Sequence, residues 1–156
     1  MNIKFLFIVF TLLLISCNND YSYVLKDLNA SKNGYVINMK DHNTKLTIAT
    51  LSGNMKFYFL KKEGEFYRTN SSFSKDSMES RASLSTIKEY KLSRGNNFIG
   101  DSIVIKKEGD HYKSIFKLID NRYTDSGDLV YEYYYDSNYK IYKIVFNSKI
   151  YTETVK

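Results

Sequence analysis

The amino-acid sequence predicts an all-β protein, or a β-rich α+β protein with one short helix. Its expected architecture is an antiparallel meander that forms a curled sheet or a small barrel. Apolar and polar residues alternate with a period of two along most of the chain, which is typical of half-buried strands. Turn residues such as Gly and Asn separate these segments. The roughly nine segments leave no room for the crossover helices that a parallel sheet requires.

The composition is that of a globular domain. The chain has 156 residues, of which 43% are hydrophobic and 26% charged, which excludes a disordered chain, a collagen-like fibre and a multi-span membrane protein. The 15 Tyr residues suit a sheet, because a ring can cover an apolar face while its hydroxyl stays in water. A single Cys excludes an intramolecular disulfide and a Cys-rich zinc site.

Residues 1–16 are predicted to form a signal peptide. Lys4 precedes an apolar run from Phe5 to Ile15 that is broken only by Thr11. As a helix at about 1.5 Å per residue, this run would cover about half of a ~30 Å hydrocarbon core. It is therefore short for a transmembrane helix and matches a secretory signal.

The end of this segment carries a motif of four residues. Leu14, Ile15, Ser16 and Cys17 are an aliphatic residue, a tolerant position, a small residue and then Cys. This pattern resembles the lipobox of bacterial lipoproteins. The resemblance implies that signal peptidase II cuts before Cys17, that its thiol receives a diacylglyceryl group, and that its new amino group is acylated with a chain such as palmitate. An ordinary secretory signal and an embedded anchor helix are the alternatives.

The lipoprotein resemblance implies a location in the bacterial cell envelope. Two or three acyl chains would hold the mature protein on its membrane. Asn18 stands where Asp would favour the inner membrane, so the outer membrane is favoured in a Gram-negative cell. Residues 17–33 are expected to hold the lipidated Cys17, a tether and a first strand or helix, and residues 34–156 the antiparallel β domain.

Within that domain the expected strands form hairpins. Each pair flanks a short turn that carries Gly or Asn, residues that tolerate a positive φ. The expected pairs are 35–40 with 46–50, 55–59 with 66–68, 103–105 with 112–118, and 129–135 with 139–145.

One passage is repeated along the chain. Residues 61–68 (KKEGEFYR) match residues 106–113 (KKEGDHYK) at an offset of 45. A duplicated hairpin would explain the match. Independent selection of the same residues by two tight turns would explain it as well.

The segment 71–85 interrupts the strand pattern. It holds seven Ser in 15 residues, and it is predicted to be a polar loop or a short helix. A strand from Leu84 to Leu92 is also compatible with the sequence. Long loops often bind a ligand or change conformation, so this segment is the first region in which function is expected.

The sequence offers little for catalysis, a metal or a cofactor, and none of these is predicted. His42 and His111 each follow an Asp in a turn, where a histidine is more often simply exposed than a metal ligand. Asp120, Asp125 and Asp128 lack the spacing of a calcium loop. No serine elbow is present.

The densest aromatic group is the candidate binding surface. Its rings could stack on a sugar, a peptide or a lipid chain, or meet a partner protein. They could also stabilise the sheet as cross-strand pairs, and this structural interpretation is the favoured one. The group comprises Tyr131, Tyr133, Tyr135, Tyr139 and Tyr142.

These observations favour a lipid-anchored envelope protein that acts as a non-enzymatic binding or assembly module, with an envelope protein as a possible partner. Export argues against nucleic acid. One alternative is a lipocalin-like carrier of a small apolar ligand, which predicts an internal cavity on the order of several hundred Å³. Another is an immunity or exclusion lipoprotein.

Overall fold

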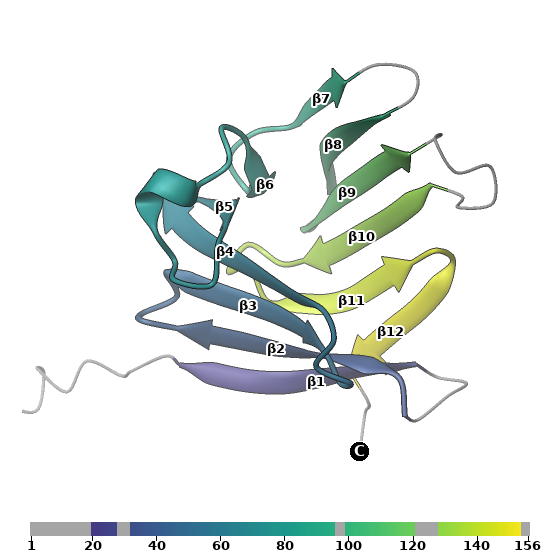
Figure 1. Cartoon of the computed structure of the whole chain (residues 1–156). Coiled ribbons are helices and arrows are strands. Elements are labelled where there is room, and N and C mark those ends of the chain that lie inside the picture. Colours follow the sequence, from purple (N-terminus) through teal and green to yellow (C-terminus); the bar gives the residue numbers. More distant parts are fainter. Residues whose placement is uncertain (1–19, 28–31, 96–98, 121–127, 154–156) are drawn as a thin grey trace, which may run out of the picture.

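The computed structural model describes residues 20–27, 32–95, 99–120 and 128–153 as one 12-stranded antiparallel sheet that curls into a half-barrel (Figure 1). The predicted all-β class and antiparallel meander are therefore confirmed. The helical content of the described residues is one short 3₁₀ turn, η1 (Lys75–Ser77). The strands are β1 (Tyr21–Asp27), β2 (Gly34–Lys40), β3 (Lys45–Thr50), β4 (Lys56–Lys62), β5 (Glu65–Thr69), β6 (Ala82–Leu84), β7 (Tyr90–Gly95), β8 (Ile99–Glu108), β9 (His111–Asp120), β10 (Leu129–Tyr135), β11 (Ile141–Phe146) and β12 (Lys149–Glu153).

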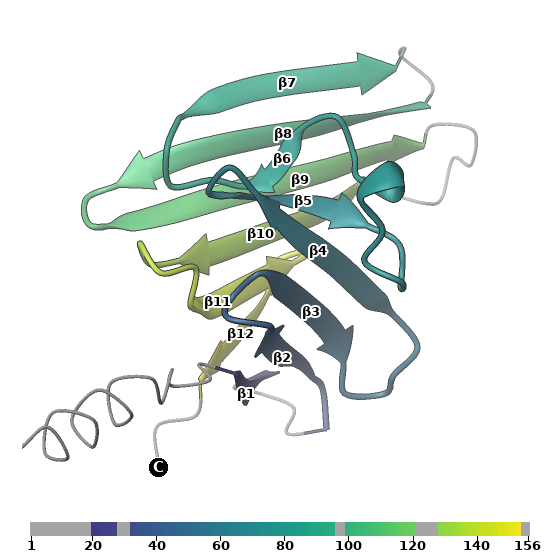
Figure 2. The ribbon, with the colours of Figure 1, turned by 90° about the vertical axis from the view of Figure 1, so that its left-hand side faces the viewer.

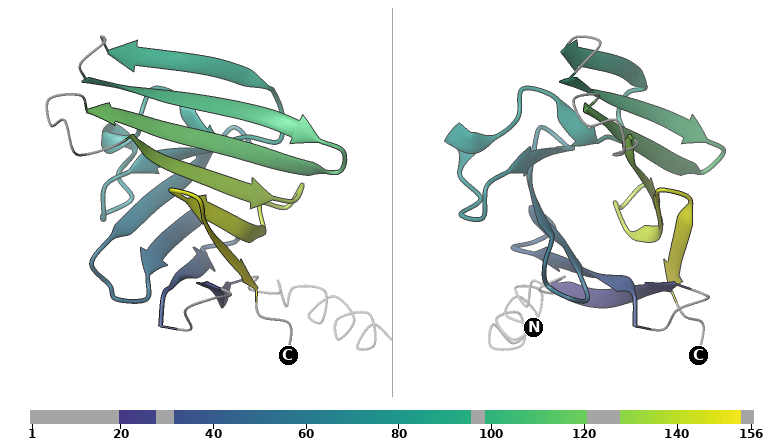
Figure 3. Two further views of the ribbon diagram at one scale, coloured as in Figure 1. Left: turned by 90° about the vertical axis from the view of Figure 1, so that its right-hand side faces the viewer. Right: turned by 45° about the vertical axis from the view of Figure 1, so that its right-hand side comes forward.

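The strand order places both ends of the described chain in the middle of the sheet. From β1 the chain steps outward, strand by strand, to β6 at one edge. It then crosses to β7 at the other edge and returns to β12, which pairs with β1 through Leu25 and Glu153. Figures 2 and 3 show how the two halves curve toward each other. Within segment 17–33, where a strand or a helix was expected, the described residues form strand β1 from Tyr21 to Asp27.

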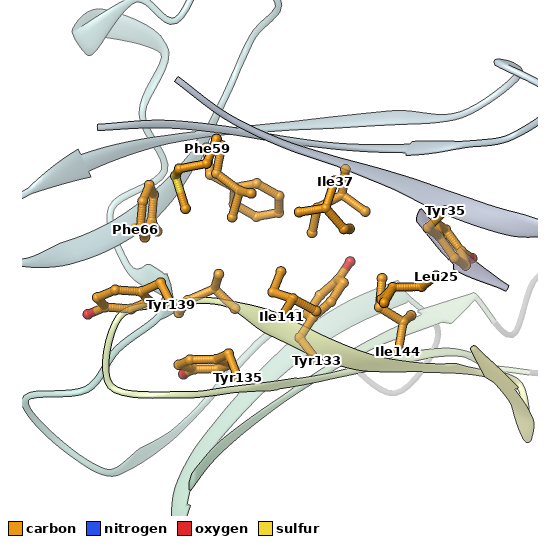
Figure 4. Close-up of a cluster of buried hydrophobic side chains, with 14 of the residues drawn as sticks. Leu25, Tyr35, Ile37, Phe59, Phe66, Tyr133, Tyr135, Tyr139, Ile141 and Ile144 are labelled. Atoms are coloured by element: carbon orange, nitrogen blue, oxygen red, sulfur yellow. The ribbon is translucent and has the colours of Figure 1, made fainter. Parts of the chain in front are cut away.

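The core lies on the concave face of the curled sheet (Figure 4). Alternation puts every second side chain of each strand on this face. The predicted apolar faces at 35–39 and 46–48 are buried there, and so are Ile103 and Ile105. The main cluster comprises Leu25, Tyr35, Ile37, Met39, Leu46, Ile48, Phe59, Phe66, Leu84, Tyr131, Tyr133, Tyr135, Tyr139, Ile141, Ile144 and Tyr151.

A β-bulge changes which residues of β11 reach the core. Tyr134 pairs with Lys143, but Tyr135 pairs with Ile141, so Tyr142 is the extra residue. An extra residue reverses the alternation beyond it. Ile144 is therefore buried, whereas Val145, which simple alternation assigns to the same face as Ile141, is only half-buried.

The repeated passage forms two hairpins whose turns differ by one position. In the first, Lys62 pairs with Glu65, and Glu63 and Gly64 both have positive φ. In the second, Glu108 pairs with His111, so the turn is Gly109-Asp110. A one-residue shift sends matching side chains to opposite faces, and the register thus favours separate selection of turn residues over duplication.

Within the Ser-rich segment 71–85, a loop with one short 3₁₀ turn leads into strand β6. A linker at 85–89 then leads to β7, so the strand expected over Leu84–Leu92 is two strands interrupted by a turn. The sequence also underestimated the number of strands, because β6, β7 and β12 are short or exposed and have weak apolar alternation.

Candidate functional site

The predicted tyrosine surface is mostly interior. Tyr131, Tyr133, Tyr135 and Tyr139 belong to the buried core, as the structural interpretation expects. Burial raises the pKa of each of these hydroxyls, because the charged phenolate would lose its hydration. Tyr142 alone stays half-buried on the outer face, with its ring 5.1 Å from that of His111.

Two of these tyrosines help to join the halves of the half-barrel. The hydroxyl of Tyr135 donates to the carbonyl of Ser85 and accepts from its amide. The hydroxyl of Tyr139 donates to the carbonyl of Gly64 and accepts from the amide of Thr86 at 3.0 Å. β6 and β7 are the two edges of the sheet and do not pair with each other. Near these edges, hydrogen bonds from tyrosine side chains therefore join the two halves of the half-barrel.

A buried ion pair lies near the same junction. Arg81 is 7% exposed and donates to the carboxylate of Asp101. Arg94, which lies on β7, pairs with the other carboxylate oxygen of Asp101 at a distance of 2.9 Å. Burial raises the pKa of Asp101, but the hydrogen bonds from Arg94 and Arg81 lower it by more, so the group is charged in the folded state.

Among the described residues, side chains pack the core inside the half-barrel. Between β4–β6 and β8–β10 the side chains leave a hollow of about 20 Å³, which has room for roughly one water. Ser85 is fully buried and its hydroxyl accepts hydrogen bonds from the amides of Ile87 and Lys88. These hydrogen bonds are those of a turn residue.

A larger hollow lies on the opposite, convex side of the sheet, over β2, β3 and β4. Its volume is about 450 Å³, within the usual range for ligand sites. We call it the outer hollow. Short side chains form its floor, longer ones its rim, and it is lined by Val36, Asn38, Lys40, Lys45, Thr47, Ala49, Thr50, Gly53, Lys56, Tyr58 and Phe73.

Strand register explains the shape of the outer hollow. Asn38, Thr47 and Tyr58 form one row across three strands, and Val36 and Ala49 lie opposite each other in the next. All point away from the core, because their neighbours in sequence point into it. The depression thus follows from small residues at the centre of the outward face.

The Ser-rich segment supplies one wall of the outer hollow. Phe73 packs its ring edge against Tyr58, with the centroids 5.5 Å apart. Its φ of +53° is unusual for a bulky residue. The side-chain oxygen of Asn70 fixes this turn by accepting from the amides of Ser72 and Ser74. The sequence pointed to this segment, but it did not show where the segment packs.

Three lysines give the outer hollow its charge. Lys40 and Lys45 form a cross-strand pair at one end, and Lys56 lies at the other. Asp41, in the adjoining turn, is 2.5 Å from the Lys45 ammonium, whose hydrogen bond and charge lower the pKa of this carboxylate. The lining contains three lysines and no carboxylate, and Asp41 offsets only part of their charge, so the outer hollow keeps a net positive charge.

A second hollow of about 580 Å³ lies on the other side of the Ser-rich loop. Lys61, Lys62 and Lys75 contribute to its lining, but so does the carboxylate of Glu79. One oxygen of Glu79 is buried without a hydrogen-bond partner. Of the two, the outer hollow is therefore the one whose lining contains lysines and no carboxylate.

The remaining sequence candidates either do not line the outer hollow or lie outside the described residues. His42 is exposed in the turn between β2 and β3, His111 is the exposed first residue of β9, and Asp128 pairs with Lys117 at 2.5 Å. Within residues 20–27, 32–95, 99–120 and 128–153, no three His, Cys, Asp or Glu side chains cluster as metal ligands would. Asp125 and Cys17 lie outside the described residues, and the side chain of Asp120 is not described.

Comparisons with known proteins give no family. No protein-family model, curated protein or solved structure matches the chain. Among the residues that the structure describes, no helix has the length and apolar character needed to cross a membrane.

Proposed function

We propose that this protein is a lipid-anchored protein of the bacterial envelope that binds another envelope component without catalysing a reaction. The lipobox-like Leu14–Cys17 segment supports the anchor. The outer hollow is the proposed binding surface. Strand β1 begins at Tyr21, four residues after Cys17, so the domain would be held within about 15 Å of its anchor.

One observation carries the choice of a binding surface over an internal site. The concave face is packed with side chains, whereas the convex face has a hollow of about 450 Å³. A carrier would need an internal space on the order of several hundred Å³, and the inner hollow measures about 20 Å³. The filled core therefore favours surface recognition.

An immunity or exclusion lipoprotein is a special case of the same proposal. Such a protein would use its surface to block an incoming toxin or phage component. No described residue favours that role over binding a resident envelope component, so the general proposal is preferred.

Site-specific photocrosslinking in intact cells tests the proposal. Tyr58 in the wall of the outer hollow is replaced by the photoreactive aromatic residue p-benzoylphenylalanine, and Tyr142 on the outer face of β11 is the matched control. We expect a specific adduct from position 58 that is absent from position 142, with both proteins in the membrane fraction. Equal labelling at both positions, or none at position 58, would contradict the proposed surface.

A further inference from the structure

We infer that the outer hollow binds an acidic saccharide, with its charges on the lysines and a sugar ring against Phe73. This inference rests on the proposed function, since it names the ligand class of the same surface. Three features of the outer hollow carry it: its charge, its side-chain hydrogen-bonding groups and its aromatic wall.

The charge of the outward face is one-sided. Alternation places 13 side chains of β1–β4 on the convex face, and none of them is a carboxylate. Like charges directly opposite each other destabilise a sheet, yet Lys40 and Lys45 form such a cross-strand pair. Asp41 offsets part of this repulsion through its pair with Lys45 at 2.5 Å, and an anion bound at Lys40 would offset the rest. The outward lysines of these strands are Lys26, Lys40, Lys45, Lys56 and Lys62.

The cations of the outer hollow are all lysines. A lysine ammonium is a mobile point charge, whereas a guanidinium selects a fixed bidentate geometry. Lys40 and Lys56 lie at opposite ends of the outer hollow and are both exposed. This arrangement suits an extended ligand with separated negative groups, such as the carboxylates on successive units of an acidic oligosaccharide.

The backbone of the floor favours a saccharide over an acidic peptide. Strand β2 pairs with β1 and β3, and β3 pairs with β2 and β4, so their backbone groups are already hydrogen-bonded. A peptide strand binds most readily at a free sheet edge, where it gains a ladder. Only side chains such as Asn38 and Thr47 remain here, and they suit ligand hydroxyls.

The Ser-rich loop holds the Phe73 ring in the wall of the outer hollow by means of an unfavourable backbone conformation. A left-handed conformation is unfavourable for an L-residue, and Phe73 adopts it at φ +53°. Strain of this kind often marks a functional position. The conformation places the Phe73 ring beside Tyr58 and 5.5 Å from the Lys45 ammonium, next to the charges that would hold the ligand.

Calorimetric titration of the full-length protein in neutral detergent micelles tests this inference. The probe is tetragalacturonate, maltotetraose is the neutral control and hexaglutamate is the acidic peptide control. We expect tetragalacturonate to bind more tightly than either control, with an affinity that falls as ionic strength rises. Lys40→Glu and Lys56→Glu should each weaken it by tenfold or more. Lys91→Glu, which reverses an exposed strand lysine on β7, should change it less than twofold.

The other outcomes reject the inference. Equal or tighter binding of hexaglutamate would replace the saccharide with an acidic peptide, and no binding of tetragalacturonate would remove the ligand class. Loss of binding in Lys91→Glu would show a general charge effect instead of a site. Crosslinking from position 58 in cells is independent of these titrations. A failed titration with a retained adduct would thus reject the saccharide and keep the binding surface.

Discussion

The hydroxyl of Tyr135 donates to the carbonyl of Ser85 at 2.9 Å and accepts from the amide of the same residue at 3.0 Å. Both residues are fully buried. One phenol thus satisfies both backbone groups of a residue that has left strand β6 and has no neighbouring strand to pair with. The half-barrel is joined at this point by a side chain of β10.

Tyr135→Phe should destabilise the fold without changing its shape. The substitution keeps the buried ring but leaves the amide and carbonyl of Ser85 without this partner. A buried unsatisfied group costs about 1–3 kcal/mol, so the free energy of unfolding should fall by about that amount. Urea denaturation followed by circular dichroism measures the change.

Tyr142→Phe is the matched control for that experiment. Tyr142 is half-buried on the outer face, and its interactions are ring contacts with His111 and Tyr134. Removal of the Tyr142 hydroxyl should change the free energy of unfolding by less than about 0.5 kcal/mol. Equal effects of the two substitutions would contradict a special role for Tyr135 at the junction.

Asp101 should make stability depend on acid pH. Its pKa is lowered in the folded chain, so its contribution is fully present above the unfolded value of about 3.9 and is lost as the pH falls through the folded value. The free energy of unfolding should therefore decline below about pH 4. Asp101→Asn should flatten this decline in denaturation curves measured from pH 2 to 7.

At neutral pH, Asp101→Asn should also cost about 3 kcal/mol, because it leaves the buried guanidinium of Arg81 without its counter-charge. Asp41→Asn provides the comparison, since Asp41 also has a lowered pKa but forms an exposed pair with Lys45. An exposed pair contributes little, so the loss should be much smaller than that caused by Asp101→Asn. A larger loss from Asp41→Asn than from Asp101→Asn would refute this ranking.

Phe73→Asn should separate binding from stability. Asn tolerates the left-handed conformation, which removes about 1–2 kcal/mol of strain, while the lost ring contact with Tyr58 costs about 0.5–1.5 kcal/mol. We expect the two effects to offset each other to within about 1 kcal/mol in thermal denaturation. Binding of the tetragalacturonate probe should weaken by fivefold or more. Unchanged binding would show that the aromatic wall is not used.

Local alternation was enough to predict the hairpins and most of the core. Tyr35, Ile37 and Met39 face inward as their period-two spacing indicates. The prediction failed where one extra residue mattered. The bulge at Tyr142 reverses the faces of β11, and because Ile144 and Val145 are both apolar, the pattern does not show which of them faces the core.

The outer hollow could not be predicted, because it depends on contacts between distant segments. Asn38, Thr47 and Tyr58 form a row only when three strands adopt one register. The sequence did indicate the Ser-rich segment as a place for function, but nothing local shows that Phe73 packs on Tyr58. The dense group of tyrosines was the predicted binding surface, but most of its rings pack in the core.

The mass of the intact protein, purified from its native membrane, tests the lipid anchor most directly. The account predicts a polypeptide that begins at Cys17 and carries a diacylglyceryl group, with a further acyl chain on its amino group. Cys17→Ala should abolish both the added mass and the incorporation of labelled fatty acid. An unmodified polypeptide, or one that still begins at Met1, would contradict the anchor and the envelope location together.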